Sequence, residues 1–535
     1  MKYKVCIQAA GIGSRLTIGK GLHKALIPIN KKSILSRIID LFPKKTSFIM
    51  LVGYKKDQIK SFIKAKYPIL DVTYVEVKKY KGKGSGPGYS LLQGKKFLQE
   101  PFIFMACDTI VFKRPPLPKR NWVGTSKAKS SKDYLIIESK NGVMTKYYDK
   151  RTENFIYSNS NIYKKNLNKP FDAFIGLAGI FDYQSFWSGL ASNRKLYKNE
   201  LQVSNGLKSI LAKKEPIEAI DFEWIDTGSD ENYSHARAFY KDNFLLKTDE
   251  FLYKEDNKII KFFLEESKAI KRFERKKYIK EIIPEINISG KNFIWYNYIK
   301  GDLLSNTNEK IIFTNFLDFL QNKIWSKELK DKKKILSLKN NSMSFYKEKT
   351  YERVRGYINK NSEADKASWI NNVKVKPIFD LLDKVDWKNM ANGKFAYFHG
   401  DPQPENVIVN NKNKFTMIDW REDFGGSLQY GDVYYDLGKI YHSLIITQKK
   451  IRDEKYFVSY EDDFAQYKFS KRRNLMKYLD YFEDFLAINK YDLYKVKMMS
   501  ALIYLNIAPL HHHPYSDLLF FHGKITLNKL LNEYI

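Results

Sequence analysis

Short apolar runs alternate with amphipathic stretches over residues 3–112 of the chain. The runs YKVCIQAA, SFIMLVG, VTYVEV and PFIFMACD are rich in β-branched and aromatic residues and have the length of buried strands. Between them, ILSRIIDLF at 34–42 and KDQIKSFIKAKY at 56–67 repeat apolar residues at helical spacing. This alternation is typical of βαβ units and predicts an α/β domain with parallel strands.

The following segment, residues 120–235, mixes strand and helix patterns. YLIIES at 134–139 and FIGLAGIFD at 174–182 have strand character, and the stretch around LQVSNGLKSILAKK at 201–214 has helical spacing. The segment closes on the polar string WIDTGSDENYSHA, with no break that would separate it from the first strands. We therefore predict one domain over residues 1–236.

The pattern changes after this domain. Residues 237–248 are predicted as a helical connector, and FLYKEDNKIIKFF at 251–263 has the alternation of two strands around a polar turn. A long amphipathic helix is predicted from Glu265 to Ile279. Because mostly helical patterns follow, we predict a bilobal α+β domain with a small strand lobe (249–300) and a large helical lobe (301–535) that carries a catalytic loop.

Composition supports a folded, two-domain protein. The chain has 535 residues, of which 43% are hydrophobic and 29% charged, and this is globular rather than disordered. No apolar run approaches the roughly 20 residues of a transmembrane helix, and the start MKYKVCIQAAG has a strand pattern rather than that of a signal peptide. Cys6 and Cys107 lie in apolar runs, which favours buried thiols over a disulfide or a zinc site. We expect a cytoplasmic protein.

The chain is strongly basic, with 93 Lys and Arg residues against 60 Asp and Glu residues and a formal charge of +33. Such a charge attracts polyphosphates, nucleic acid or anionic lipid. The basic residues are scattered, however, and the densest run, KAIKRFERKK at 268–277, has helical spacing with Ile270 and Phe273 on its inner face. We interpret this run as a solvated helix face, and we expect no specific nucleic-acid partner.

The first chemical motif is a glycine loop, AAGIGSRL at 9–16, directly after the first predicted strand. Gly11 and Gly13 would let backbone N–H groups approach a polyphosphate at the start of a helix. A dinucleotide fingerprint is excluded because Leu16 stands where a third glycine is required. A P-loop is excluded because Gly13 and Gly19 are one residue too far apart.

Several separated motifs resemble those of the sugar-phosphate nucleotidyltransferase superfamily. The glycine loop is similar to the family's AAGxGSR, HKALIPI at 23–29 resembles its P-K-x-L-x-P-I segment, and WIDTGS at 224–229 resembles W-x-D-x-G-T. The resemblance implies a Rossmann-like domain with a mixed, mostly parallel sheet, which transfers a nucleotide from an NTP to a phosphate and releases pyrophosphate. It assigns nucleotide binding to four loop residues, Ala10, Gly11, Gly13 and Ser14.

The same resemblance implies roles for the charged residues. Asp108 and Asp226 would hold one Mg²⁺ between the α-phosphate and the attacking phosphate. Arg15 would hold the leaving pyrophosphate and Lys24 the reacting α-phosphate. No acid–base residue is required, because the attacking phosphate is already ionised near neutral pH.

A second glycine-rich segment, KGKGSGPGYSLL at 81–92, opens a predicted helix. The resemblance places Gly84 and Gly86 at the nucleotide base, and a flexible turn is the alternative. The base itself stays open, with CTP, UTP or a similar NTP as candidates.

A second pair of motifs, HGDPQPENVIV at 399–409 and MIDW at 417–420, resembles the aminoglycoside phosphotransferase and choline kinase superfamily. The resemblance implies a protein-kinase-like domain that uses ATP. It makes Asp401 the catalytic base for the substrate hydroxyl and makes Asn406 and Asp419 ligands of Mg²⁺. VIV and FTMI around NNKNK predict a hairpin that returns Asp419 to the same cleft. The resemblance also implies supporting roles for two flanking residues, His399 and Asp436.

In the strand lobe, Lys261 of IIKFF is the candidate phosphate-contacting lysine. Glu274 on the following helix is its predicted ion-pair partner, with Glu265 and Glu266 as alternatives. Residues 244–258 contain no glycine, so the phosphate-covering glycine loop of the family is absent or built differently.

The two chemistries join in one hypothesis, a bifunctional enzyme. The second domain would phosphorylate a small hydroxyl compound, a sugar or an alcohol such as choline, ethanolamine or glycerol, and the first would couple the resulting phosphate to a nucleotide. The resemblance implies that such products serve capsule, lipopolysaccharide or lipid decoration. The alternatives are a nucleotidyltransferase with a regulatory, non-catalytic kinase-like domain and, least favoured, a nucleic-acid-binding protein. A homo-oligomer is compatible with the sequence.

Overall fold

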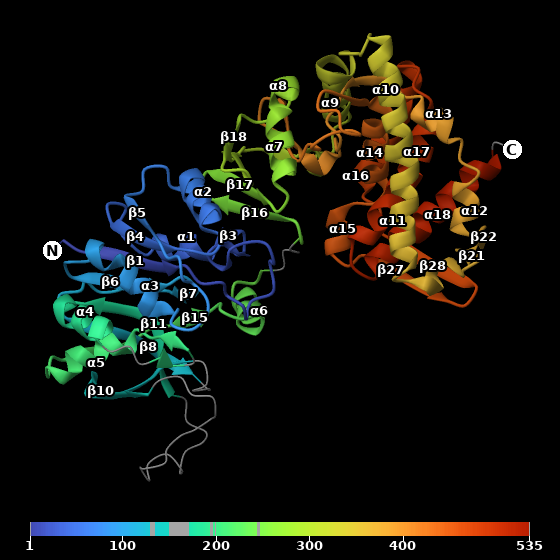
Figure 1. Cartoon of the computed structure of the whole chain (residues 1–535). Helices are drawn as coiled ribbons and strands as arrows, with labels where there is room; N and C mark the ends of the chain where they lie inside the picture. Colours follow the sequence, from blue (N-terminus) through green and yellow to red (C-terminus); the bar gives the residue numbers. More distant parts are fainter. Residues whose placement is uncertain are drawn as a thin grey trace. The chain divides into compact units, whose positions relative to one another are not determined.

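The computed structural model describes residues 2–128, 134–148, 171–192, 196–197, 199–242 and 247–533. The chain divides into two compact units (Figure 1), Met1–Glu266 with Ile288–Trp295, and Ser267–Asn287 with Tyr296–Ile535. Part of the predicted connector, residues 243–246, lies outside the described residues. Among the helices of the described ranges, none combines the length and apolar character needed to cross a bilayer.

The first unit is built on a nine-stranded mixed sheet with the order β5-β4-β1-β6-β11-β8-β14-β10-β9. Its first four strands are parallel and coincide with the four apolar runs that predicted them. β11 pairs antiparallel with β6 and β8. The sheet strands are β1 Lys4–Ala9, β4 Ser47–Val52, β5 Val72–Glu76, β6 Phe102–Ala106, β8 Asn121–Ala128, β9 Ile136–Lys140, β10 Val143–Tyr148, β11 Phe171–Ile180 and β14 Ile217–Asp221.

Helices cover this sheet, and short strand pairs edge it. In α2 the apolar residues Ile59, Phe62 and Ile63 recur at helical spacing and are buried, as the sequence predicted. The helices are α1 Ile34–Ile39, α2 Lys56–Lys66, α3 Pro87–Gly94, α4 Tyr183–Ser192, α5 Ser204–Ala212 and α6 Asp230–Phe239. The short strands are β2 Pro28–Ile29, β3 Lys32–Ser33, β7 Thr109–Val111, β12 Leu196–Tyr197, β13 Glu200–Leu201 and β15 Trp224–Asp226.

The predicted strand hairpin forms β16 Glu250–Glu255 and β17 Lys258–Phe263. With β18 Ile286–Ser289 and β19 Phe293–Asn297 it makes a four-stranded sheet in the order β16-β17-β19-β18, here termed the hairpin sheet. The strands β16 and β17 and residues Ile288–Trp295 of the other two strands belong to the first unit, and α2 lies beside β16 and β17 in Figure 1.

The hairpin sheet shares the hydrophobic core of the first unit. Phe251, Tyr253 and Phe293 are buried together with residues of β1, α1 and α2. The Phe62 ring contacts Tyr253 at 5.1 Å and Phe293 at 6.0 Å between centroids. Tyr253 Oη donates to the carbonyl of Leu26 at 2.8 Å. The sheet is therefore part of the body that carries the glycine loop.

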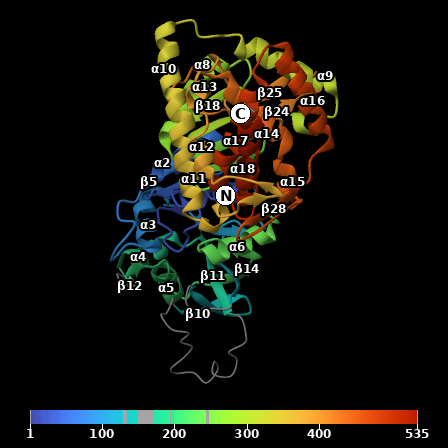
Figure 2. The ribbon, with the colours of Figure 1, turned by 90° about the vertical axis from the view of Figure 1, so that its right-hand side faces the viewer.

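The second unit is mostly helical. Figure 2 shows its long helices α11, α17 and α18 beside one another, and these three helices contribute many residues to the main core cluster. The helices are α7 Glu266–Glu274, α8 Lys276–Ile279, α9 Lys310–Leu320, α10 Lys332–Met343, α11 Lys349–Ile358, α12 Ile378–Leu382, α13 Trp387–Ala391, α14 Val433–Ile445, α15 Gln448–Arg452, α16 Arg473–Ile488, α17 Leu493–Ile507 and α18 Tyr515–Glu533.

The remaining strands of the second unit are short, and most form hairpins. They are β20 Asp302–Leu303, β21 Trp369–Ile370, β22 Val373–Lys374, β23 Phe395–Tyr397, β24 Val407–Val409, β25 Phe415–Met417, β26 Tyr430–Asp432, β27 Tyr456–Glu461 and β28 Phe464–Phe469. β24 and β25 form the hairpin predicted around NNKNK. An α/β unit followed by an α+β unit confirms the predicted fold class.

The charged run at 268–277 differs from its prediction in two ways. The single long helix predicted from Glu265 is divided into α7 and α8 at Arg275. Ile270, expected on the inner face, is 36% exposed, whereas Arg275 is fully buried. The run is therefore more than a solvated helix face, because one of its arginines lies in the interior.

Candidate active sites

The glycine loop follows directly from the buried strand β1, so its position is fixed by the centre of the sheet. No helix begins at the loop, contrary to the prediction; the residues after it form turns and the short 3-10 helix Lys24–Leu26. Gly19 and Gly21 explain the difference, because their φ angles of +72° and +105° are left-handed and interrupt a right-handed helix.

The loop glycines leave room for a backbone approach and for Lys24. A Cβ added to Gly11 would meet no atom within 4 Å, so its peptide is open on one side. Gly13 has φ +69°, and a Cβ there would lie 2.7 Å from Lys24 Cδ. Lys24 therefore crosses the loop at a distance that only glycine allows. Ala10 is buried and Ser14 is exposed at the loop surface.

The four charged residues predicted for this site come together. Lys24 Nζ lies 2.6 Å from Asp108 Oδ2. The antiparallel pair β7–β15 brings Asp226 beside the segment that follows Asp108. A Cβ added to Gly228 would lie 3.1 Å from Asp226 Oδ1, 3.3 Å from Asp108 Oδ2 and 3.4 Å from Arg15 Nη2. Two carboxylates and two cations thus surround one point.

Electrostatics at this point favour an added cation near the carboxylates. Burial would raise the pKa of Asp108, but the charge and hydrogen bond of Lys24, together with the charge of Arg15, outweigh this and lower the pKa. Burial and the charge of Asp108 raise the pKa of Asp226. Asp226 is also fixed by hydrogen bonds, because Tyr134 Oη donates to its Oδ2 at 2.8 Å and Asn232 Nδ2 at 2.7 Å.

Two residues that the sequence did not mark as functional position this site. Asp230 Oδ1 accepts hydrogen bonds from the backbone N–H groups of Thr17 at 2.7 Å and Ile18 at 2.9 Å, so α6 holds the end of the glycine loop. His23 occupies the proline position of the family motif. It is fully buried, and its Nδ1 accepts from the N–H of Ala25 at 3.1 Å, so that it caps the turn carrying Lys24.

The second glycine-rich segment has a packing role. Gly86 has φ +117°, and a Cβ there would lie 2.9 Å from the carbonyl oxygen of Leu201 in β13. Gly84 has φ +82°, and its N–H donates to the carbonyl of Asn199 at 2.7 Å. Packing against β13 accounts for Gly86, and the positive φ accounts for Gly84; the contact of both with a nucleotide base stays a prediction.

In the second unit, the structure brings together Asp401, Asn406 and the segment that carries Asp419. Asn406 Nδ2 donates to Asp401 Oδ2 at 3.1 Å and to the Asp401 carbonyl at 3.0 Å. The N–H of Ile418 donates to the carbonyl of Asn406 at 2.9 Å, and this contact places Asp419 next to the catalytic loop. Asp419 has φ +62°, a conformation that non-glycine residues seldom adopt and that clusters at functional sites.

The groups around Asp401 favour its ionised form. Burial would raise its pKa, but the ammonium of Lys439, whose Nζ lies 3.2 Å from Asp401 Oδ1, and the neighbouring histidines His442 and His399 together outweigh this and lower the pKa. Asp436 fixes the start of the loop, because its carboxylate accepts hydrogen bonds from the N–H groups of His399 at 2.9 Å and Gly400 at 2.6 Å. These contacts fit the supporting roles implied for His399 and Asp436.

Arg275 ties the catalytic loop to the segment after Asp419. Its guanidinium donates to the carbonyls of Leu428 at 3.0 Å and His399 at 3.2 Å, and also to those of Phe398 and Arg421. The Phe398 ring lies 3.9 Å below it. Burial lowers the pKa of Arg275 to about 9, which leaves it charged at neutral pH. An arginine in a highly charged run gives no sign of this role in the sequence.

Comparison with known protein families agrees with both candidate sites. Residues 5–119 match the MobA-like NTP transferase domain, and residues 338–469 match the phosphotransferase enzyme family. The first match contains the glycine loop, Lys24 and Asp108, and the second contains Asp401, Asn406 and Asp419. The chain joins an NTP transferase domain to a phosphotransferase domain. These matches confirm the two family resemblances noted in the sequence. They also confirm the predicted enzyme class, with nucleotidyltransferase and kinase-type activities.

Among solved structures, the NTP transferase domain is similar to CTP:phosphocholine cytidylyltransferase from Streptococcus pneumoniae, with 19% identity over 45% of this chain and 99% of that one and a TM-score of 0.36. It is also similar to a UDP-glucose pyrophosphorylase, with 21% identity over 45% and 100% of the two chains and a TM-score of 0.37. The inositol-1-phosphate CTP transferase from T. maritima has 12% identity over 46% and 98%, with a TM-score of 0.34. A search of curated proteins gave no match.

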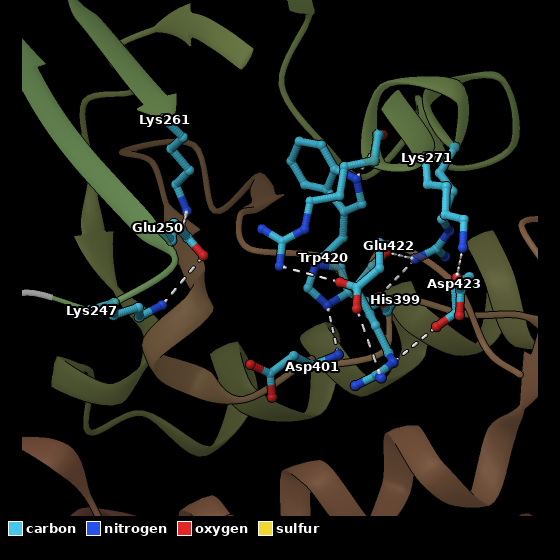
Figure 3. A network of polar contacts seen from close by, with 12 residues as sticks. Lys247, Glu250, Lys261, Lys271, His399, Asp401, Trp420, Glu422 and Asp423 are labelled. Atoms are coloured by element: carbon cyan, nitrogen blue, oxygen red, sulfur yellow. Dashed lines mark hydrogen bonds and ion pairs between the residues drawn. The ribbon is translucent and has the colours of Figure 1, made fainter. Parts of the chain in front are cut away.

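The lysine predicted for the phosphotransferase reaction has a partner that the sequence did not suggest. Lys261 Nζ lies 3.4 Å from Glu250 Oε1 on the neighbouring strand, and Lys247 Nζ lies 3.5 Å from Glu250 Oε2 (Figure 3). Glu274 is exposed at the end of α7 in the second unit. Its predicted pairing with Lys261, like the ATP contact of Lys261, stays a prediction.

Both domains offer oxygen ligands that suit Mg²⁺. Within the described ranges no cluster of three or more His, Cys, Asp or Glu side chains is arranged to hold a metal ion. Each site instead has a pair, Asp108 with Asp226 and Asn406 with Asp419. Mg²⁺ is commonly bound by one or two carboxylates together with substrate phosphates and water, so these pairs fit a nucleotide-bound ion. A cation would also relieve the repulsion between Asp108 and Asp226.

We predict that Arg275→Met impairs the phosphotransferase domain, although Arg275 acts only by holding the catalytic loop in place. Several buried carbonyls would lose their donor at about 1–3 kcal/mol each, so we expect the free energy of unfolding to fall by at least about 3 kcal/mol. ATP-dependent phosphorylation should fall at least about tenfold, because the loop that carries Asp401 loses this tie. Urea unfolding and ADP release measure the two effects. Lys277→Met, at an exposed position of α8, is the control. Wild-type behaviour of both variants would contradict the prediction.

Proposed function

We propose that this chain is a bifunctional cytoplasmic enzyme that makes a nucleotide-activated small molecule in two steps. The phosphotransferase domain transfers the γ-phosphate of ATP to a hydroxyl compound. The NTP transferase domain then couples the new phosphate to NMP from an NTP such as CTP or UTP, and pyrophosphate leaves. The proposal is supported above all by two carboxylate sites in one chain, because the product of a kinase is the substrate of a nucleotidyltransferase.

In the first step, the substrate hydroxyl would donate its proton to Asp401 as its oxygen attacks the γ-phosphorus. Lys439 keeps Asp401 ionised, so that it accepts the proton, and Asn406 fixes the orientation of its carboxylate. Asn406 and Asp419 would hold Mg²⁺, which neutralises phosphate charge when bound.

In the second step, an oxygen of the new phosphate would attack the α-phosphorus of the NTP. Lys24 would balance the charge that develops on the α-phosphate, and Arg15 would hold the departing pyrophosphate. Asp108 and Asp226 are the residues that would hold Mg²⁺ at this site. The product would supply an activated group for surface glycan or lipid decoration.

An isotope experiment tests the two-step order. The purified protein is incubated with Mg²⁺, a second NTP, unphosphorylated acceptors and ATP whose γ-phosphate carries heavy oxygen, and the products are analysed by mass spectrometry. We expect a nucleotide-linked product whose acceptor-side phosphate is heavy. A control with pre-phosphorylated acceptors bypasses the kinase step. A product formed only in that control would instead support the alternative, a nucleotidyltransferase with a non-catalytic kinase-like domain.

A further inference from the structure

Basic side chains from three separate segments form a group that reaches Asp401 through Lys439. Lys439 comes from α14 and lies at Asp401 Oδ1. Arg421 is next to the catalytic loop, because its N–H donates to the His399 carbonyl at 3.0 Å and a Cβ added to Gly400 would lie 2.4 Å from Arg421 Cβ. Lys349 comes from the start of α11.

Two aromatic rings connect these cations. Lys349 Nζ and Arg421 Cζ lie 4.3 Å and 4.9 Å from the centre of the Phe345 ring. Arg421 Cζ and Lys439 Nζ lie 5.9 Å and 6.0 Å from the centre of the Tyr435 ring. The two rings touch edge to face, with centroids 5.3 Å apart. The three side chains are therefore grouped around the Phe345 and Tyr435 rings, and this group is here termed the cationic wall.

The carboxylates nearby balance only part of this charge, and Asp401 is the partner of Lys439. Glu422 is 3.9 Å from Arg421 and 3.6 Å from Arg272, and Asp423 is bound to Lys271 at 2.7 Å. In the part of the chain that the structure describes, the ammonium of Lys349 has no hydrogen bond or ion pair.

Arg353 adds a further positive charge to this wall, one turn along the same face of α11 as Lys349. Burial, together with the charges of Arg421 and Arg353, lowers the pKa of Lys349 to about 6, so that its amino group takes up a proton at neutral pH only when an anion binds beside it. A half-buried ammonium group beside other positive charges is unfavourable unless an anion binds to it.

Phe345 lies in a stretch of the helix that departs from α-helical geometry. Helices α10 and α11 are joined without a break by the π-helical segment Ser344–Glu348, which carries Phe345. π-helical turns are rare and occur frequently at functional sites.

The two oxygens of Asp401 face different groups. Oδ2 accepts from Asn406, which the proposed function places at the metal and ATP. Oδ1 lies at Lys439, which belongs to the cationic wall. Resting on that proposed function, we propose that the phosphate acceptor is an anionic hydroxyl compound, a hydroxy acid or a phosphorylated alcohol. Its carboxylate or phosphate binds Lys349, Arg353 and Arg421, and its hydroxyl faces Asp401.

The reaction is an ordinary phosphoryl transfer. The acceptor oxygen forms a bond to the γ-phosphorus, the bond from that phosphorus to the bridging oxygen of ADP breaks, and the hydroxyl proton goes to Asp401. Amino alcohols such as choline and ethanolamine are disfavoured, because their cationic heads would meet like charge.

Acceptors matched in shape test this proposal. ADP release by the full chain is compared for glycerate against glycerol, gluconate against sorbitol, and glycerol phosphate against choline and ethanolamine. We expect kcat/KM to be at least about tenfold higher for the anionic members, the effect of one charge-assisted hydrogen bond. The glycerate and glycerol phosphate arms distinguish a carboxylate from a phosphate. A preference for neutral or cationic acceptors overturns the inference but leaves the proposed kinase reaction standing.

Substitutions locate the effect. Lys349→Met should raise KM for the anionic acceptor about tenfold and leave KM for ATP unchanged, while Lys349→Arg should keep both near the wild-type values. Lys347→Met, at an exposed position of the same helical segment, is the matched control. If Lys349→Met raises KM for ATP instead, the wall serves the nucleotide and the inference fails. If the wild-type protein neither binds nor hydrolyses Mg·ATP, the proposed function fails first.

Discussion

Asp401→Asn should reduce ATP-dependent phosphorylation by about a hundredfold to ten-thousandfold, the usual contribution of a positioned general base. Asparagine keeps the shape of the side chain but cannot accept the hydroxyl proton. The contacts of Asn406 with the Asp401 carbonyl and of Asp436 with the loop do not involve the substituted group, so the loop should remain folded. Single-turnover formation of the phosphorylated acceptor gives the rate of the chemical step.

The same variant should release pyrophosphate at the wild-type rate when a pre-phosphorylated acceptor is supplied. Asp453→Asn, an exposed position at the end of α15, should change neither activity and controls for loss of a negative charge. An unchanged phosphorylation rate in Asp401→Asn would remove Asp401 from the role of base. Loss of both activities would mean that the two reactions depend on one another.

Asp108→Asn and Asp226→Asn should have the opposite selectivity. Each is expected to slow pyrophosphate release by about a hundredfold to a thousandfold, the scale for losing one preorganised electrostatic contact at the reacting groups. Asp108→Asn also removes the ion-pair partner of Lys24, which lies 2.6 Å away. Pyrophosphate release with a pre-phosphorylated acceptor and a second NTP is the measurement.

Magnesium dependence distinguishes a metal ligand from a residue that only supports the fold. Both variants should need a higher Mg²⁺ concentration for half-maximal pyrophosphate release, whereas Asp221→Asn, exposed at the end of β14, should not. ATP-dependent phosphorylation should remain in all three proteins. An unchanged Mg²⁺ requirement in both Asp108→Asn and Asp226→Asn would argue against their role as ligands.

Local sequence patterns predicted most of the elements because each pattern reflects burial of its own residues. The four parallel strands, the hairpin of β16 and β17, and the hairpin that returns Ile418 to Asn406 were all visible in the alternation of apolar and polar positions. Catalytic motifs were also visible, because they keep fixed residue types at short spacing.

The features that sequence reasoning missed depend on contacts between distant segments. Arg275 is buried by carbonyls more than a hundred residues away, and nothing in its own helix distinguishes it from exposed neighbours. Gly86 packs against β13, and the N–H of Gly84 donates to the carbonyl of Asn199, both remote in sequence. Lys349, Arg421 and Lys439 meet only because α11, the segment after β25, and α14 converge on two aromatic rings.

The hairpin sheet limits where the chain could be cut into two folded fragments. Phe251, Tyr253 and Phe293 have at most 1% of their surface exposed, and aromatic side chains of this kind bury about 150–250 Å² each. A chain cut within residues 237–248 would uncover this surface on both fragments. The strands predicted to serve ATP are thus a structural part of the nucleotidyltransferase body. The predicted connector at 237–248 is therefore not a boundary at which the two activities could be separated without exposing this core.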